Sequence, residues 1–224
     1  MWGLVPGLGT YVRRRVRRFS DRSRARRWAD LRARVDWDDV KRVLDLGGKP
    51  SFWTDEAILT RPLEITCLNL RGEPSTQRLG QATVDVLVGD ATAPPLDPAD
   101  YDLVFSNSVI EHVGGDDAIA AFAAVTRQGR QYFLQTPNRW FVLEPHFVLP
   151  FHFLLPRRVK AAIVMWWDRG PCRRTYREAL ERVDSIHLLT RRELDLLFPG
   201  AAIVVDRKWL LPKSFMVFGR NGEG

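Results

Sequence analysis

A short apolar run, Val43–Leu46, carries one acid and ends at two adjacent glycines, Gly47 and Gly48. Short apolar runs punctuated by glycine are typical of buried strands in α/β proteins. Glycine lacks a Cβ atom, so the backbone at this turn can take positive φ or lie close to a ligand. Because ligands of open α/β sheets bind beyond the carboxyl ends of such strands, the turn is a candidate ligand loop. The same pattern also occurs in turns that bind nothing, so the following segments decide its meaning.

Similar apolar runs recur along the chain and alternate with helical patterns. This alternation predicts an α/β fold with a mostly parallel sheet and helices on both faces. The last two strands are separated only by a short polar and proline-containing connection, residues 206–213, which is too short for a crossover helix. The last strand should therefore pair antiparallel. Seven strands are expected, at residues 42–46, 63–70, 84–91, 101–107, 131–135, 202–205 and 214–219, with helices at 55–59, 116–127, 174–183 and 190–197, the last begun by a Thr190–Glu193 capping box.

Basic residues concentrate at the N-terminus. Residues 1–34 hold eleven Arg against Asp21 and Asp30, a net charge of +9, so the rest of the chain carries −2 of the total +7. Apolar residues recur at steps of three and four across residues 11–35 with arginines between them, apart from one gap. This pattern predicts a basic amphipathic helix within an arm that spans residues 1–38. Three roles stay open for the arm: a leading helix packed on the domain, an anchor on an anionic membrane surface, or a nucleic-acid contact.

Other patterns narrow the class of protein. Cys67 and Cys172 lie far apart without CxxC spacing, which predicts neither a zinc site nor a disulfide framework and fits a reducing compartment. The four histidines are dispersed, so we expect no metal site. Residues 140–167 are apolar but interrupted by prolines and basic residues, so no run reaches the roughly 20 residues of a membrane span. Residues 1–9 do not resemble a secretory signal. We expect a cytoplasmic protein, peripheral at the inner face of a membrane if the arm is an anchor.

Two segments carry a resemblance to a known family. Tyr101–Val113, with the sequence YDLVFSNSVIEHV, runs from an apolar strand into a polar turn, and Leu189–Pro199 precedes the last two strands. With the glycine turn before them, these motifs make residues 39–220 resemble the class I S-adenosylmethionine-dependent methyltransferases, of the broad small-molecule (type 11) group. The resemblance implies a Rossmann-like sheet that closes with an antiparallel strand, and S-adenosyl-L-methionine as the cofactor.

The resemblance also implies roles for residues at the strand ends. Asp45 would receive the ammonium group of the cofactor, and Gly47 and Gly48 would let the backbone approach its methionine portion. Asn69 would meet the ribose hydroxyls, because an amide can both donate and accept hydrogen bonds. The remaining assignments are Asp90 and Ala91 against the adenine, and Ser106 and Asn107 beside the sulfonium.

Two positions depart from the family pattern. That pattern is acid-x-Gly-x-Gly-x-Gly, and here Lys49 and Ser51 stand at the second and third glycine positions. Asn69 replaces the usual acid, so its bond to the ribose lacks charge assistance. Two alternatives to a methyltransferase therefore remain. One is a degenerate methyltransferase fold kept as a binding or scaffold protein; the other is a nicotinamide-dependent Rossmann oxidoreductase, which the antiparallel ending disfavours.

Methyl transfer to an oxygen atom is helped by a group that removes a proton. His112 follows the fourth strand, where it is a candidate for this role or a residue that only shapes the cofactor pocket. Glu144 and His146 follow the fifth strand in an aromatic and proline-rich segment, which we expect to form a lid or substrate-side insertion over residues 137–185. We expect a small-molecule, sugar or lipid-like acceptor. A nucleic-acid substrate is disfavoured because the domain outside the arm is slightly acidic.

Overall fold

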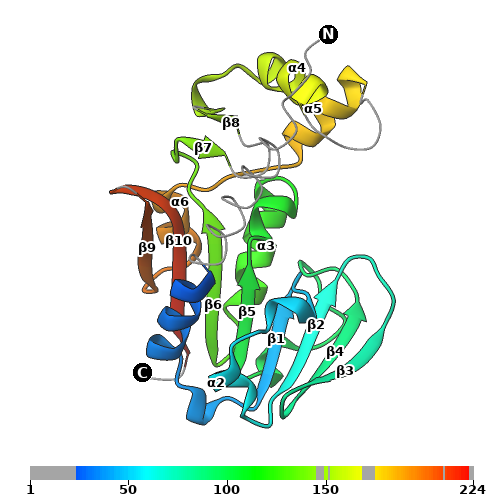
Figure 1. The fold of residues 1–224 in the computed structure, drawn as a ribbon, viewed down its shortest axis with the longest axis vertical. Helices are drawn as coiled ribbons and strands as arrows, with labels where there is room; N and C mark the ends of the chain where they lie inside the picture. The colour runs from blue at the N-terminus through cyan, green and yellow to red at the C-terminus, as the bar shows by residue number, and fades with distance from the viewer. Residues whose placement is uncertain (1–23, 145–148, 151, 168–174, 209, 222–224) are drawn as a thin grey trace, which may run out of the picture. The chain divides into compact units, whose positions relative to one another are not determined.

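The computed structural model describes residues 24–144, 149–150, 152–167, 175–208 and 210–221 (Figure 1). The chain divides into two compact units, Met1–Asp39 and Val40–Gly224. In the described part of the first unit, residues 24–34 form a helix and Trp37–Asp39 a 3-10 turn, η1. The Trp37 indole N–H donates to the Leu31 carbonyl at 3.1 Å, which fixes the turn on the end of the helix. Residues 11–23 of the predicted amphipathic helix lie outside the described residues.

The second unit is built on one eight-stranded sheet, in the order β3-β4-β2-β1-β5-β6-β10-β9. β4, β2, β1, β5 and β6 run parallel to one another, whereas β10 is antiparallel to both β6 and β9. The predicted Rossmann-like sheet and its antiparallel ending are therefore confirmed. The strands are β1 (Arg42–Leu46), β2 (Glu64–Asn69), β3 (Ser75–Leu79), β4 (Ala82–Val88), β5 (Leu103–Asn107), β6 (Gln131–Pro137), β9 (Ala202–Lys208) and β10 (Leu211–Arg220).

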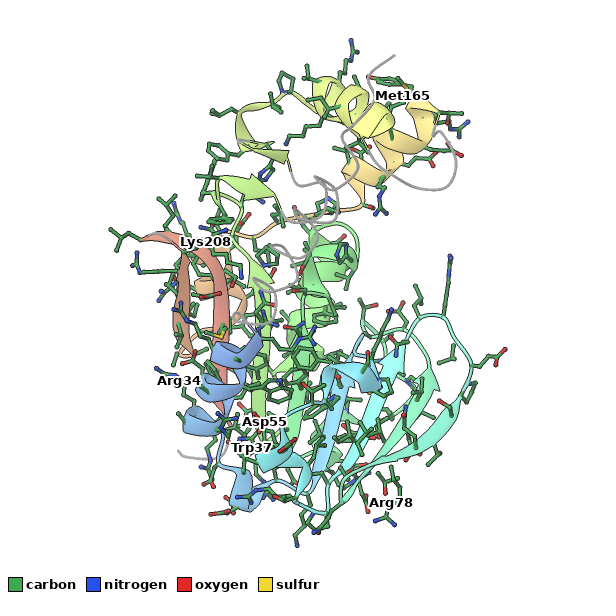
Figure 2. The ribbon with its side chains drawn as sticks, viewed as in Figure 1. Arg34, Trp37, Asp55, Arg78, Met165 and Lys208 are labelled. Carbon is green, nitrogen blue, oxygen red and sulfur yellow. The ribbon has the colours of Figure 1, made fainter. Side chains whose placement is uncertain are left out.

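The sheet has eight strands where the sequence predicted seven, and the extra one is β3. It pairs antiparallel with β4 at the sheet edge through a turn at Gly80, whose φ is +60°. Four of its five residues are exposed, among them Arg78, labelled in Figure 2. An exposed edge strand has no buried face, so it carries no alternation of apolar and polar residues that a sequence could reveal.

Both faces of the central strands are buried. Successive side chains of a strand point to opposite faces, and in β1 the four residues from Val43 to Leu46 are all inaccessible to solvent. Leu44 and Leu46 pack in a core cluster with Phe122 of α3 (Asp116–Thr126) and Phe198, the C-cap residue that follows α6 (Arg191–Leu197). Asp45 lies on the opposite face. The single acidic residue of β1 is therefore held within the interior of the fold.

Shorter elements connect the strands and complete the fold. The Thr190–Glu193 capping box is confirmed at α6, and α5 begins with a second box between Thr175 and Glu178. Among the described residues, no helix is long and apolar enough to cross a membrane. The remaining elements are η2 (Pro50–Phe52), α2 (Glu56–Leu59), η3 (Pro98–Asp100), η4 (Ile110–His112), β7 (Leu143–Glu144), β8 (Leu149–Pro150), η5 (His152–Leu154), α4 (Arg157–Trp167) and α5 (Tyr176–Asp184).

The helix α4 is not among the elements that the sequence predicted. Its residues Arg157–Trp167 follow several prolines and lie within the segment that the sequence predicted as a lid or substrate-side insertion, with no helix assigned to them. In the structure α4 pairs with α5 and forms a small separate core of Ala161, Val164 and Ala179, against which Met165 packs (Figure 2). A helix can therefore form here because a second helix covers its apolar face.

Candidate active site

The carboxyl ends of β1, β2 and β4 lie side by side and are joined by short hydrogen bonds. The Gly47 N–H donates to the Leu68 carbonyl at 2.7 Å, and the Gly89 N–H donates to the Asn69 carbonyl at 2.9 Å. The Asn69 side-chain amide donates to the Gly48 carbonyl at 2.8 Å. These bonds bring together the strand ends at which Asp45, Asn69 and Asp90 lie, three residues that are far apart in the sequence.

Asp45 is fully buried at the end of β1. Its Oδ2 atom accepts a hydrogen bond from the Trp53 indole N–H at 2.9 Å and lies 3.9 Å from the Cys67 thiol. Its Oδ1 atom is buried and has no hydrogen-bond partner among the described residues. Burial raises the pKa of Asp45 to about 7, and the bonds from Trp53 and Cys67 lower it only in part. This carboxyl group is thus poised between its neutral and ionised forms near neutral pH.

The two glycines of the first loop fit against neighbouring side chains. A Cβ atom on Gly48 would lie 1.8 Å from Asp45 Oδ2, and one on Gly47 would lie 2.7 Å from the Val109 methyl groups. Gly47 also has a φ of +74°, which L side chains rarely adopt. Lys49, at the second glycine position of the family pattern, is exposed. The chain therefore keeps glycine at the two positions where a side chain would collide with the site.

Trp53 reaches Asp45 from an aromatic cluster. Its ring lies 5.1 Å from that of Phe105 on β5, and the ring of Phe52 lies 5.5 Å from Phe105 (both between centroids). Phe105 in turn stacks on Phe133 of β6 at 4.9 Å. The loop after β1 thus folds inward on aromatic residues, and a protein side chain satisfies one oxygen of Asp45. Sequence reasoning missed Trp53; the only signal is an indole eight residues after a buried acid.

Asp90 has the opposite surroundings. Its Oδ1 atom accepts hydrogen bonds from the Thr92 backbone N–H at 2.8 Å and from the Thr92 hydroxyl at 2.7 Å. These bonds, the backbone one first, lower the pKa of Asp90, which is largely open to solvent. Asp90 is therefore an ionised acid that holds its own turn. The next residue, Ala91, is half-buried and packs against the core cluster.

The end of β5 holds the other two predicted cofactor residues. Ser106 is fully buried and its hydroxyl donates to the Leu46 carbonyl at 3.2 Å, so it links β5 to β1 inside the sheet. Asn107, the last residue of β5, is half-buried. After it, Ser108 has a φ of +57° and its hydroxyl donates to the Gln135 side chain at 2.7 Å. Asn107 thus stands closer to solvent than Ser106 does.

The turn η4 contains an acid that sequence reasoning did not select. Glu111 is fully buried, and its Oε2 accepts a hydrogen bond from the Thr136 hydroxyl of β6 at 3.0 Å. Its backbone carbonyl accepts from the His187 N–H at 2.8 Å. His112, the candidate chosen from sequence, is exposed. The only signal for Glu111 was an acid within the otherwise apolar run that follows β5.

The remaining catalytic candidates lie in the segment after β6. Glu144 belongs to β7, where it pairs with Leu149 of β8. His146 lies outside the described residues. Among the described residues, no group of three or more His, Cys, Asp or Glu side chains could hold a metal ion.

Residues 39–132 match a family model described as a methyltransferase domain. Two uncharacterized proteins of Mycobacterium tuberculosis, from strains CDC 1551 and H37Rv, are each 27% identical over 142 residues, covering 56% of this chain and 48% of theirs. The chain therefore spans about half the length of the curated relatives it matches.

Solved structures are similar to this chain at low sequence identity. The methyltransferase domain of bacterial CtHen1-C is 13% identical, with a TM-score of 0.52, over 90% of this chain and 97% of that one. A magnesium protoporphyrin IX methyltransferase of Synechocystis PCC 6803 is 11% identical, with a TM-score of 0.49, over 97% of this chain and 89% of that one. Residues 39–132 are thus similar to the methyltransferase-domain family, and the sheet of the chain has the Rossmann-like class I methyltransferase fold.

Proposed function

We propose that this chain is an S-adenosyl-L-methionine-dependent methyltransferase that moves a methyl group to an oxygen of a small-molecule, sugar or lipid-like acceptor. The observation that supports this most is the meeting of Asp45, Asn69 and Asp90 at adjacent strand ends, where Asn69 is bonded to Gly48 and Gly89. Ligands of such sheets bind at this edge. The solved magnesium protoporphyrin IX methyltransferase of the same fold has S-adenosylhomocysteine bound.

The polar atoms at the strand ends fit the groups of that cofactor. The unpartnered Oδ1 of Asp45 is a buried acceptor suited to an ammonium group. Asn69 uses its amide N–H on Gly48, which leaves its amide oxygen for a ribose hydroxyl. Asp90 keeps a second carboxylate oxygen for an exocyclic amine, and Ala91 follows it. Asn107 is the residue of β5 that we assign to the neighbourhood of the sulfonium, whereas Ser106 positions the strand.

The bound cofactor supplies a methyl group on a positively charged sulfur, so the chain has little covalent chemistry to perform. Its tasks are to align the acceptor oxygen, exclude water and take up the acceptor's proton. We assign the uptake of the acceptor's proton to His112, which is exposed beside the buried Glu111, or to Glu144 and His146. We assign residues 137–185, which contain α4 and α5, to the acceptor side of the site.

Calorimetry with S-adenosylmethionine, S-adenosylhomocysteine and NAD tests the proposal, together with transfer of a labelled methyl group to a metabolite pool. Asp97 provides a matched control, because its Oδ1 accepts from the Ala99 N–H at 2.9 Å in a turn like that of Asp90. Asp90→Ala should weaken binding of S-adenosylhomocysteine by about tenfold, as expected for loss of a charge-assisted hydrogen bond. Asp97→Ala should leave it unchanged. Binding of NAD, without binding of S-adenosylmethionine or S-adenosylhomocysteine, would refute the proposal.

One observation favours the degenerate binding or scaffold protein as a second candidate. The Trp53 indole already occupies one oxygen of Asp45, and Lys49 and Ser51 replace two glycines of the family pattern. Under this alternative, calorimetry detects no binding of S-adenosylmethionine or S-adenosylhomocysteine. Binding without transfer to any acceptor in the pool would also support it.

We further propose that the arm, residues 1–38, holds the protein on an anionic membrane surface, at the inner face of a membrane. Its charge of +9 over residues 1–34 supports attraction to acidic headgroups. The test is sedimentation with vesicles that contain phosphatidylglycerol, using a full-length variant in which the arginines of residues 13–18 are replaced by glutamine. The variant should stay in the supernatant. Equal sedimentation of variant and wild type would contradict the anchor.

A further inference from the structure

A hollow of about 530 Å³ lies between α4, α5 and the residues that follow α5. It contains none of the residues assigned to the cofactor or to proton transfer. Three of its side chains carry nitrogen atoms that bind anions, two are apolar and one is a carboxylate. The lining residues are Arg157, Lys160, Val183, Asp184, Ile186 and His187.

The electrostatics of the hollow favour an anion. Arg157 and Lys160 stand in the first turn of α4, a turn without acidic residues. The N-terminal end of a helix carries a partial positive charge, so cations there are unfavourable unless an anion lies nearby. Asp184 is the only carboxylate among the lining residues, which leaves the hollow with a positive balance even when His187 is neutral.

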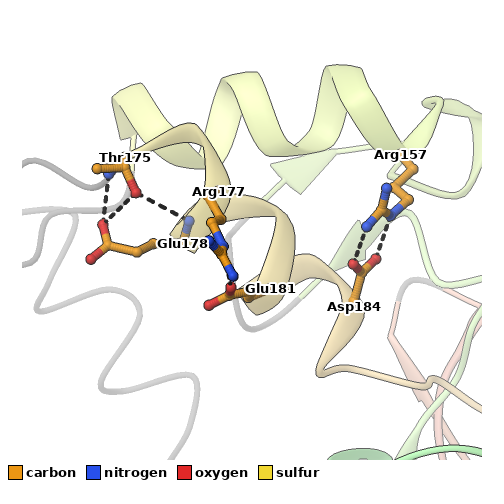
Figure 3. Close-up of polar contacts among 6 residues, drawn as sticks. All are labelled: Arg157, Thr175, Arg177, Glu178, Glu181 and Asp184. Carbon is orange, nitrogen blue, oxygen red and sulfur yellow. Dashed lines mark hydrogen bonds and ion pairs between the residues drawn. The ribbon is translucent and has the colours of Figure 1, made fainter.

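Asp184 also fixes the orientation of the Arg157 guanidinium (Figure 3). Arg157 Nε donates to Asp184 Oδ1 at 2.6 Å, and Arg157 Nη2 donates to Asp184 Oδ2. The hydrogen bonds from Arg157 lower the pKa of Asp184, so this acid stays ionised and holds the Arg157 guanidinium in place. A guanidinium has five N–H donors, and two of them serve this pair. The remaining N–H donors of Arg157 therefore belong to a side chain whose position Asp184 already fixes.

His187 adds a polar side-chain atom that no described residue pairs with. Its Nδ1 atom is buried and has no hydrogen-bond partner among the described residues. Its backbone N–H donates to the Glu111 carbonyl at 2.8 Å, which ties it to the turn after β5. Buried polar atoms without partners are uncommon and often mark a place for a ligand or water. Val183 and Ile186 give the same hollow an apolar wall.

We propose that this hollow holds an oxyanion of the methyl acceptor, a phosphate or carboxylate group, with Arg157, Lys160 and His187 as its ligands. The body of the acceptor packs on Val183 and Ile186. The tie between His187 and Glu111 connects the hollow to the end of β5, the strand assigned to the neighbourhood of the sulfonium. That the ligand is the acceptor rests on the proposed methyltransferase function, whereas the oxyanion site depends only on contacts within the hollow.

Binding of soluble probes to the full chain without cofactor tests the site directly. The probes are inorganic phosphate, glucose 6-phosphate, dihexanoyl phosphatidic acid below its micelle concentration, and uncharged glucose. A phosphorylated probe should bind and glucose should not. Lys160→Gln and His187→Gln should each weaken that binding by about tenfold, as expected for loss of a hydrogen bond to a charged group. If glucose 6-phosphate binds more tightly than dihexanoyl phosphatidic acid, the oxyanion belongs to a sugar-like acceptor. The reverse order indicates a lipid-like acceptor.

Arg158→Gln is the matched control, because Arg158 is exposed in the same turn of α4 and does not line the hollow. It should bind the probes like the wild type, and circular dichroism should show all variants folded. Absence of binding by every anionic probe, or an equal loss in Arg158→Gln, would overturn the oxyanion site. A separate titration with S-adenosylhomocysteine distinguishes failure of this site from failure of the proposed function, since each measurement omits the other ligand.

Discussion

The tips of β1 and β4 present the same residue type at the same edge of the sheet, in opposite chemical states. Asp45 is enclosed by the aromatic cluster of Trp53 and Phe105, and burial raises its pKa to about 7. Asp90 accepts two hydrogen bonds from Thr92 in a solvent-exposed turn, which lower its pKa. The pattern of strand, acid and turn is shared by the two tips. The charge of each acid depends on its exposure to solvent and on the hydrogen-bond donors around it, and the sequence pattern specifies neither.

This difference divides the tasks that the two acids can perform. Asp90 offers a full negative charge to an amine at any pH near neutrality, because its pKa is lowered. Asp45 offers a carboxyl group that holds a proton at about half occupancy near pH 7, and one of its oxygens is already used by Trp53. An ammonium group that reaches Asp45 Oδ1 would therefore also displace its proton.

The largest expected effect comes from Asp45→Asn. The pKa of Asp45 is about 7 when folded and 3.8 when unfolded, so the folded chain binds this proton more tightly. The resulting stability is complete below the unfolded pKa and is lost as the pH rises through the folded one. Between about pH 4 and pH 8 the wild type should lose about 4 kcal/mol of unfolding free energy through this group, and Asp45→Asn should not. Urea unfolding across this range measures the difference, and parallel profiles would contradict the buried state of Asp45.

A smaller loss is expected from Gly48→Ala. The added Cβ atom would lie 1.8 Å from Asp45 Oδ2, so the carboxyl group or the loop has to move. Such overpacking costs about 1–3 kcal/mol. Gly115→Ala is the control, because a Cβ atom there meets nothing within 4 Å. Measuring the free energy of unfolding of both variants at one pH tests this contact. Equal losses in the two variants would contradict it.

Trp53→Phe should have an effect of similar size to that of Gly48→Ala, but only where Asp45 is ionised, and it should move the pH profile. Phenylalanine keeps a ring against Phe105 but lacks the indole N–H that donates to Asp45. Loss of one hydrogen bond to a charged group costs about 1.5–3 kcal/mol, at the pH values where Asp45 is ionised. Because this bond lowers the pKa of Asp45, its removal should shift the fall in stability to higher pH. An unchanged midpoint in urea titrations would mean that Trp53 does not contact the ionised acid.

The elements that the sequence predicted well are those whose signal is local. β1 and β5 are short runs buried on both faces, and such runs are apolar throughout whatever surrounds them. The Thr190–Glu193 box marks the start of α6 because its bonds join residues three apart. The antiparallel ending followed from a connection too short for a crossover helix. Each of these inferences required only neighbouring residues.

The features that the sequence did not reveal depend on distant partners. β3 is stabilised by pairing with β4, and α4 by the apolar face of α5. In the candidate site, the state of Asp45 follows from Trp53, which approaches it through packing on another strand. The pattern gave the position of the acid but not its protonation, because burial is a property of the assembled fold.

The smallest effect is expected from Asp90→Asn, which makes it the counterpart of Asp45→Asn. Asparagine keeps an oxygen that can accept from the Thr92 N–H, so the turn persists. A lowered pKa gives stability that is present above the ordinary value of 3.8 and lost only as the pH falls through the lower folded value. Between about pH 5 and pH 8, Asp90→Asn should therefore follow the wild-type profile within about 0.5 kcal/mol. A slope as steep as that of Asp45 would mean that the two strand tips do not differ in exposure.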